Sequence, residues 1–399
     1  MSVFRTFGVD SPTPKLTSGA AKLGEMNFAF VDMGQGDCTM ISDPANNVYI
    51  IDCGSIDRLP AESMDKAQKL LRKWAGDRKI ELIITHPDQD HYNKFWELLT
   101  FVEPIVMVKN IYFSYAKSDT SPLGNYTVGY FSSNLHIFGN PDIVEVTLNS
   151  TTDRIKTWQE GTDYKVPTEA GLIDEVLELA SGKVDDKAWS VKIIAGNVDS
   201  NYISKKDKSN TASLVTLAQF DTLKLLLTGD STSETFTYLA DYKANTIKNV
   251  DTFQIPHHGS ETSIPEASFV DTVNPKSLII SVGLLNTSFF LPRKTIIDAW
   301  LKSKALRAGS LVIDYWVSGN KYYKNYDRLQ EITAVAWKDF NYYTTDSRTF
   351  SWLKNPDDAI GGTIFYGFSN KNYFLYRVKT NKELWITGIE GSLFDQRWV

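Results

Sequence analysis

The chain has 399 residues, of which 42% are hydrophobic and 23% charged, so it holds enough apolar side chains for a large globular core. Its net charge of -6 excludes a strongly basic surface, and with it strong nonspecific binding to nucleic acid. Two cysteines, Cys38 and Cys53, are too few for a disulfide framework, and no segment has the roughly 18 apolar residues of a membrane span. We therefore expect a cytoplasmic protein that does not enter the membrane.

The first regular structure is expected after an irregular N-terminal extension, residues 1–25. Three short strands are predicted within residues 26–54, followed by an amphipathic helix at 64–74. The apolar run at 81–86 is too short for a helix and too apolar for an exposed strand. It predicts a buried strand that carries His86 to its carboxyl end, where ligands bind in open α/β sheets.

The middle of the chain predicts an insertion with aromatic strands at 108–116 and 127–133 and one helix around 172–180. Regular structure resumes with a strand pair at 212–220 and 223–230. The remaining elements expected in this region are a helix from about Ser233, strands at 251–256 and 275–283, and a helix between Thr295 and Lys304.

The composition changes near residue 305, beyond which aromatic residues are dense. Lysines interleave the rings of residues 315–326 and 365–378, which is compatible with a stacking surface for single-stranded nucleic acid. The commoner explanation is a small β-rich subdomain whose aromatics pack a core or a dimer interface. A homo-oligomer formed through this region is the corresponding expectation.

Histidines are the strongest chemical feature of the sequence. Four of the five lie in two short segments, HPDQDH at 86–91 and HHGS at 257–260. In the first, four of six side chains are metal-ligand types on a loop that follows a buried strand. A third segment, LKLLLTGD, ends an apolar strand with the carboxylate of Asp230. Each segment alone has an ordinary structural interpretation, but together they predict a metal site.

These segments belong to six motifs whose order resembles the metallo-β-lactamase superfamily, and specifically the hydrolase domain of ComEC-type DNA-uptake proteins. The motifs are VDMGQGD (31–37), IDCG (51–54), THPDQDH (85–91), LLTGD (226–230), PHHGS (256–260) and SVG (281–283). The resemblance covers about residues 26–300. It implies an α/β (α+β) fold, a four-layer αββα sandwich over residues 26–304, with 305–399 as an aromatic, β-rich C-terminal extension.

The resemblance also implies the ligands and the metal. His86 and Asp88 would bind one ion, Asp90 and His91 a second, with Asp230 bridging and His257 completing the shell. Because Asp88 stands where the superfamily usually has histidine, the site is rich in oxygen, which favours Mn²⁺ alongside Zn²⁺. One or two divalent ions are therefore expected.

The sequence departs from the family pattern in two places. No histidine stands at the third histidine motif, where this chain has Asn210 and Ser213. Leu291 occupies a further histidine position, between Asn286 and Pro292. The sequence leaves open whether His258 compensates, whether one metal suffices, or whether activity is weak.

The mechanism that the resemblance implies is hydrolysis by a metal-activated water. Asp90 would orient the attacking hydroxide, and His258 or Ser260 would contact a phosphate or protonate the leaving group. Gln35 and Asp37, in the GQGD turn, would support a ligand histidine, although turn geometry alone explains this glycine-rich segment equally well.

The sequence leaves three functions open. The first is a phosphodiesterase or nuclease acting on nucleic acid. The second is a hydrolase of small cyclic or signalling (di)nucleotides, which suits the acidic net charge. The third is a catalytically silent metal-binding module, suggested by Leu291 and by the missing histidine of the third motif.

Overall fold

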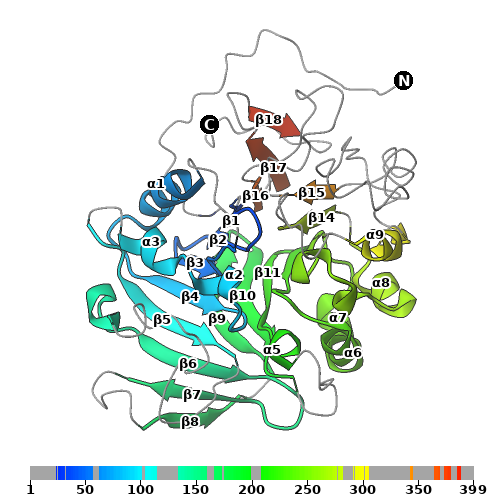
Figure 1. Ribbon diagram of the computed structural model, residues 1–399, viewed down its shortest axis with the longest axis horizontal. Helices are drawn as coiled ribbons and strands as arrows, with labels where there is room; N and C mark the ends of the chain where they lie inside the picture. The colour runs from blue at the N-terminus through cyan, green and yellow to red at the C-terminus, as the bar shows by residue number, and fades with distance from the viewer. Residues whose placement is uncertain are drawn as a thin grey trace.

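The computed structural model describes most of the chain between residues 26 and 304 and four strands beyond it. The described ranges are 24, 26–31, 33–56, 63–100, 104–114, 134–159, 166–172, 175–198, 208–275, 277–281, 291, 293–300, 302–304, 342–344, 364–368, 373–378 and 384–387. Within them the chain forms two β-sheets with helices on their outer faces (Figure 1).

The first sheet has eleven strands in the order β18-β17-β16-β1-β2-β3-β4-β5-β6-β7-β8. Strands β3 to β6 run parallel, and the other neighbours pair antiparallel. The strands are β1 (Met26–Phe30), β2 (Thr39–Ser42), β3 (Val48–Ile51), β4 (Ile80–Ile84), β5 (Val108–Phe113), β6 (Asp142–Thr147), β7 (Arg154–Trp158), β8 (Thr168–Gly171), β16 (Ile364–Phe368), β17 (Tyr373–Val378) and β18 (Leu384–Thr387).

The second sheet has seven strands in the order β15-β14-β13-β12-β11-β10-β9. Strands β9 to β12 form an antiparallel meander, and β12 to β15 run parallel. The strands are β9 (Leu177–Val184), β10 (Lys187–Ala195), β11 (Val215–Phe220), β12 (Leu223–Leu227), β13 (Thr252–Gln254), β14 (Ser277–Ile280) and β15 (Tyr342–Thr344).

The helices are short, and most lie on the outer faces of the sheets (Figure 1). They are α1 (Ser63–Ala75), α2 (Gln89–Tyr92), α3 (Phe95–Thr100), α5 (Lys208–Thr211), α6 (Ser233–Tyr242), α7 (Ala244–Ile247), α8 (Ala267–Val273) and α9 (Lys294–Trp300), with 3-10 turns η1 (Leu135–Phe138), η3 (His257–Gly259) and η4 (Glu261–Ser263).

Two buried clusters of apolar side chains show how the layers pack. One contains Phe28 and Tyr49 from the first sheet together with Leu217 of the second, so the two sheets meet face to face. The same cluster continues through the second sheet to Trp300 of α9. The other cluster joins the opposite face of the first sheet to Trp74 of α1 and to α3. The four-layer αββα arrangement predicted from the sequence is confirmed.

Central strands are buried on both faces, which explains their apolar composition. Every residue of β1, β2, β3 and β4 is buried, as expected for strands covered by a helix layer on one side and a second sheet on the other. By contrast, every residue of the edge strand β8 is exposed. Because the central strands are rigidly enclosed, the loops at their carboxyl ends start from fixed positions.

The prediction of a helix around residues 172–180 is wrong where the structure describes that segment. Residues Leu177–Val184 form β9, which pairs antiparallel with β10. Its leucines, glutamate and alanine favour a helix in isolation, but the neighbouring edge of β10 offers a full ladder of backbone hydrogen bonds. Tertiary pairing therefore overrides local propensity at this edge.

Strands β15 to β18 bear out the β-rich character predicted for the C-terminal region. β15 extends the second sheet beside β14, and β16 extends the first sheet beside β1. The division at residue 305 and a homo-oligomer formed through this region stay predictions, and the N-terminal extension lies outside the described residues apart from Gly24. No helix in the described part of the chain has the length and apolar content needed to cross a membrane.

Candidate metal centre

A cluster of imidazoles and carboxylates lies where strand ends of the two sheets meet. The segment after β4 contributes His86 and His91, and the turn after β12 contributes Asp230. The loop after β13 contributes His257 and His258. Because β4 pairs in parallel with β3, and β13 with β12, each pair of strands delivers its loops to one edge.

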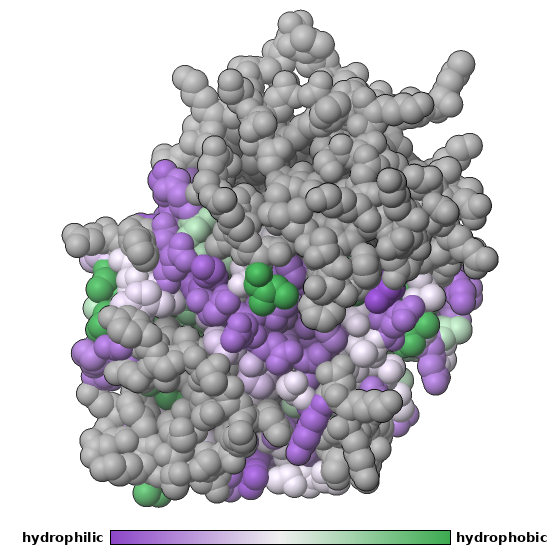
Figure 2. Space-filling model, viewed as in Figure 1, coloured by the Kyte–Doolittle hydropathy of each residue, from purple (hydrophilic) through white to green (hydrophobic). Residues whose placement is uncertain are grey.

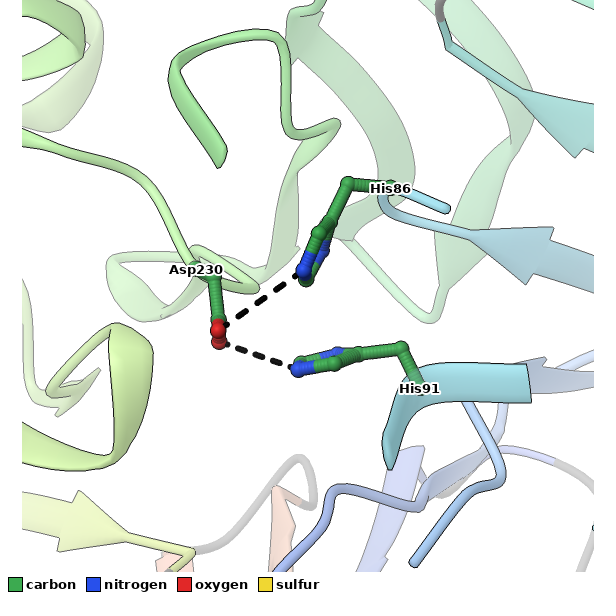
Figure 3. Close-up of side chains that lie close together, drawn as sticks. All are labelled: His86, His91 and Asp230. Atoms are coloured by element: carbon green, nitrogen blue, oxygen red, sulfur yellow. Dashed lines mark ion pairs between the residues drawn. The ribbon is translucent and has the colours of Figure 1, made fainter. Parts of the chain in front are cut away.

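Asp230 lies at the centre of this cluster and is only 3% exposed. Its Oδ1 is 3.1 Å from His91 Nε2, and its Oδ2 is 3.7 Å from His86 Nε2 (Figure 3). Oδ2 is also 3.7 Å from His257 Nε2 and 3.8 Å from His258 Nε2. One carboxylate thus faces four imidazoles.

The Nδ1 atoms of the two first-sheet histidines are engaged with neighbouring groups. His91 Nδ1 lies 2.7 Å from Asp52 Oδ2, which is a carboxylate acceptor. His86 Nδ1 lies 3.0 Å from Thr85 Oγ1. Since the Thr85 hydroxyl donates to Asp52 at 2.7 Å, its oxygen accepts from His86 Nδ1–H. With Nδ1 engaged in this way, both imidazoles turn Nε2 toward Asp230.

The second sheet orients His258 in the same way. His258 Nδ1–H donates to the backbone carbonyl of Ser281 at 2.7 Å. Its Nε2 then lies 3.3 Å from Asp90 Oδ2. Three histidines, one from the second sheet and two from the first, point the same ring nitrogen into one small volume.

The arrangement fits a divalent cation, because three buried ring nitrogens converge on buried carboxylates. Nε2 of His86, His91 and His258 is buried, and the polar atoms facing it are carboxylate oxygens of Asp230 and Asp90 at 3.1–3.8 Å. Two donor sets lie within 4.8 Å: His86, His91 and Asp230, and Asp90, His91 and His258. Nitrogen and carboxylate donors in this number suit a metal ion.

A third set of nearby groups, Asp37, Asp52 and His91, is better explained by hydrogen bonding. Asp52 Oδ1 accepts from the backbone N–H of Thr85 at 2.8 Å, and its Oδ2 is taken by Thr85 and His91. Asp52 is fully buried. It acts on the imidazole rather than on a metal.

Charges in the cluster stabilise one another. Burial by itself disfavours the ionised form of Asp230, but the surrounding histidines outweigh it and hold the pKa of Asp230 well below its usual value. Burial likewise disfavours protonation of His91, but Asp230 and Asp52 outweigh it and keep the pKa of His91 well above its usual value.

The second donor set behaves in the same way. Burial of His258 is outweighed by Asp230 and Asp90, which raise the pKa of His258 to about 9. Burial of Asp90 is outweighed chiefly by its hydrogen bond to His258, so the pKa of Asp90 falls to about 2. The cluster is therefore built to hold positive charge, supplied either by protons or by metal.

The loop after β13 is in a strained conformation that separates the two adjacent histidines. His257 and His258 both have φ of +51°, a region that non-glycine residues rarely adopt. As a result His258 points inward with a side chain 3% exposed, whereas the His257 side chain is 21% exposed. His257 Nδ1 lies 2.7 Å from Thr262 Oγ1 at the rim of the site.

Two glycines in the motifs allow these loops to pack closely. A Cβ at Gly54 would overlap the backbone of Asp90. Gly229 has φ of +51°, and a Cβ there would lie 2.6 Å from Thr85 Oγ1. The glycine before Asp230 therefore lets the second-sheet carboxylate approach the first-sheet histidines.

Asp37 connects the two sheets beside the cluster. Its side chain accepts hydrogen bonds from Gln254 Nε2 and, at 3.0 Å, from Ser281 Oγ. Burial, with the nearby charge of Asp52, raises the pKa of Asp37 to about 6. Since the carbonyl of Ser281 also orients His258, Asp37 has an indirect role at the centre.

The other predicted site residues lie around the cluster. Asn210 is buried, and its Nδ2 lies 3.4 Å from the His257 ring nitrogens. Ser213 is also buried. Asp88 Oδ2 lies 3.7 Å from His86 Nε2. Gln35 and Ser260 line the cavity beside the cluster, as does Leu291, whereas Asn286 and Pro292 lie outside the described residues. All twelve predicted ligand, catalytic and supporting residues fall in the described structure, but their roles stay predictions.

Sequence reasoning missed the role of Asp52. The signal was present, since Asp52 directly follows β3, the parallel neighbour of the strand that carries Thr85 and His86. A carboxylate at the end of such a strand lies beside the next loop, where it can bind the Nδ1 of a ligand histidine. Ser281 acts through its backbone carbonyl, so its residue type gave no indication.

Comparisons with known proteins give only distant likenesses. No family model matches this sequence, and no curated protein does. Among solved structures the chain is similar to CmlA, a diiron β-hydroxylase from Streptomyces venezuelae, with 14% identity and a TM-score of 0.37. The match covers 80% of this chain and 52% of CmlA, so the chain spans about half the length of that protein.

Two shorter proteins give matches of the same order. The short form of human tRNase Z has 12% identity and a TM-score of 0.32, covering 64% of this chain and 91% of the other. A Parabacteroides distasonis protein named "Putative metal-dependent hydrolase" has 12% identity and a TM-score of 0.33, and the match covers 70% of this chain and 90% of the other. Likenesses this distant carry no argument about activity, so the function is argued from the site itself.

Proposed function

We propose that the protein is a metal-dependent hydrolase. The observation that carries the proposal is the convergence of the buried Nε2 atoms of His86, His91 and His258 around the ionised carboxylate of Asp230. Structural metal sites are usually closed, whereas catalytic sites keep an open position. Asp230 and His258 of this cluster line an open cavity.

The distances support a division of the ligands into two groups that share Asp230. His86 and His257 each have Nε2 3.7 Å from Asp230 Oδ2, and Asp88 Oδ2 lies 3.7 Å from His86 Nε2. Asp90, His91 and His258 form the other group. The grouping differs from the resemblance in adding His258 to the second ion.

The mixed imidazole and carboxylate donors suit Zn²⁺ or Mn²⁺, in one or two positions. Such an ion lowers the pKa of water and polarises the oxygen of the bond to be cleaved. Asp90 faces the cavity and stays ionised because its pKa is about 2, so its carboxylate can orient an attacking water. Ser260, also on the cavity wall, is placed to donate a hydrogen bond to the substrate.

A phosphodiester is the substrate class that we propose for this centre. Two adjacent donor sets suit a phosphate, since paired ions stabilise both the attacking and the leaving oxygen. The substrate would be either nucleic acid, as in a nuclease, or a small cyclic or signalling (di)nucleotide. The acidic net charge and a cavity of about 630 Å³ favour the small substrate.

Metal content and hydrolysis measured together test the proposal. The purified protein should contain one or two equivalents of metal by mass spectrometry and should cleave bis(4-nitrophenyl) phosphate when supplied with Mn²⁺ or Zn²⁺. Asp230→Ala should abolish both properties. His136→Ala is the matched control, because His136 is exposed on η1 outside the cluster.

Other outcomes would select the alternatives. Cleavage of single-stranded DNA in preference to small phosphodiesters would favour a nuclease. Metal bound with no turnover on any phosphodiester would favour the catalytically silent module, for which the apolar Leu291 in the cavity wall is the supporting observation.

A further inference from the structure

The cavity beside the metal-ligand cluster is also lined by residues that do not belong to the cluster. The cluster contributes Asp88, Asp90, Asp230 and the two histidines of η3 to the lining. The volume of about 630 Å³ lies within the range of roughly 300–1,000 Å³ that is typical of small-molecule sites. The remaining lining residues therefore decide which small molecule is accepted.

Arg293 is the only residue of permanent positive charge among the described residues that line the cavity. Its backbone N–H donates to the carbonyl of Gly259 at 2.8 Å, so the residue is fixed beside the loop that carries His258. A guanidinium group has donors and no lone pair, so it cannot bind a metal. Its chemistry at this position is directed to an anion.

Because several carboxylates line the cavity, the one arginine there matters for whether an anion can bind. Asp88, Asp90, Asp230 and Glu261 would repel an anionic substrate if their charge stood alone. Divalent ions held by the first three would offset that charge. Arg293 would then add donors in a planar fork, which matches two oxygens of a phosphate better than an ammonium group does.

Apolar side chains also line the cavity. Ile56, Pro87 and Leu291 line the cavity, and Ile56 is 48% exposed. Hydrophilic side chains gather across the middle of the face in Figure 2, and a small hydrophobic patch lies among them. Single exposed apolar residues are common, but one at the mouth of a polar cavity provides a contact for an apolar part of the ligand.

We propose that Arg293 is a specificity-determining residue that binds the anionic phosphoryl group of a small phosphodiester, while Ile56 and Leu291 contact an aromatic or apolar substituent of the same molecule. This inference rests on the proposed function and names its substrate class. It predicts that a substitution at Arg293 weakens binding of anionic substrates without changing metal binding.

Arg293→Gln tests the inference in the full-length, metal-loaded protein. The variant should keep its metal content, while KM for bis(4-nitrophenyl) phosphate rises roughly ten- to a hundredfold, the range expected for loss of a hydrogen bond between charged groups. Hydrolysis of the neutral ester 4-nitrophenyl acetate should change less than twofold. Arg293→Lys keeps the charge but loses the planar fork of donors. Its KM for bis(4-nitrophenyl) phosphate should lie between the values of the parent and of Arg293→Gln.

Binding of inorganic phosphate gives a readout that does not need turnover. Isothermal titration should show phosphate binding to the metal-loaded protein weakened by a similar factor in Arg293→Gln. Arg154→Gln is the matched control, since Arg154 of β7 pairs with Glu169 of β8 and does not line the cavity. It should leave both measurements unchanged.

The two proposals fail in different ways. Normal hydrolysis with unchanged KM and unchanged phosphate binding in Arg293→Gln would overturn the inference and leave the hydrolase standing. Absence of turnover on every substrate, with phosphate binding that still depends on Arg293, would support the anion site and remove the hydrolase. Equal loss of activity on the neutral and anionic esters would also overturn the inference, because it would show a structural role.

Discussion

The two halves of the metal-ligand cluster are built differently. In the first-sheet half, His86 and His91 are fully buried, and both are connected through hydrogen bonds to the buried carboxylate of Asp52. In the second-sheet half, His257 and His258 stand in a strained turn, and one of them reaches the surface. The first half is therefore enclosed by the fold, whereas the second half is open to the cavity through His257.

The largest effect is expected from breaking the first half at Asp52. Asp52→Ala removes the acceptor for Thr85 N–H, for the Thr85 hydroxyl and for His91 Nδ1, all buried. We expect a loss of about 3 kcal/mol in the free energy of unfolding and roughly 10- to 100-fold in metal affinity. Urea denaturation and a competitive chelator titration measure the two quantities. Asp52→Asn, which keeps the shape, should lose less of both.

His258→Asn should separate function from stability in the second half. Asparagine tolerates positive φ better than histidine, so the strain in the turn is partly relieved. We expect the free energy of unfolding to stay within about 1 kcal/mol of the parent, while binding of the second ion is lost. Metal stoichiometry by mass spectrometry reports the change. A stability loss as large as that of Asp52→Ala would contradict the contrast between the halves.

The pH dependence of metal affinity and of stability gives a finer test of the second half. His258 must release its proton to bind metal, and its pKa is about 9. Metal affinity should therefore fall as the pH is lowered from 9 to 6.5, by at most about tenfold per unit. The metal-free protein has the opposite slope, because the raised pKa of His258 stabilises the fold below about pH 6.5 and this contribution is lost as the pH rises through 9.

Chelator titrations and urea curves at matched pH values check both slopes. His258→Asn is the control, since it should flatten the part of each slope that belongs to this imidazole. If metal affinity and the stability of the metal-free protein changed with pH in the same direction, a group other than His258 would dominate the titration.

The smallest effect is expected at the mouth of the cavity. Ile56→Ser removes an exposed apolar contact without touching a ligand. We expect the free energy of unfolding to change by less than about 0.5 kcal/mol and KM for bis(4-nitrophenyl) phosphate to rise a fewfold, with kcat nearly constant. Methyl 4-nitrophenyl phosphate, which has one ring fewer, should show a smaller rise. Equal effects on the two esters would argue against contact with the aromatic group.

The first-sheet half was also the more predictable half. HPDQDH places its ligands within six consecutive residues after an apolar strand, so local pattern alone reveals it. The partnership of Asp52 with Thr85 and His91 depends on parallel pairing of β3 with β4, which the sequence does not specify. Local pattern also misassigned β9, because pairing with β10 overrides the helical propensity of Leu177–Val184.

The inward orientation of His258 could not be read from the sequence for a similar reason. Two adjacent histidines look equivalent in the sequence, and the hydrogen bond from His258 Nδ1 to the carbonyl of Ser281 distinguishes them. Arg293 likewise gave no local indication, since it is brought to the cavity by a backbone contact with Gly259. Long-range packing therefore supplied what residue type and spacing left undetermined.

The pairing of β1 with β16 has a consequence for how the chain is made. β1 leaves the ribosome long before its outer neighbour β16, because Met26–Phe30 and Ile364–Phe368 are far apart in the sequence. At about 5–20 residues per second, that edge of the growing sheet stays open for roughly tens of seconds. An unpaired edge strand is a template for intermolecular pairing. Newly made protein should therefore be prone to aggregate until β16 has formed, and folding should be slow because this contact is so distant in sequence.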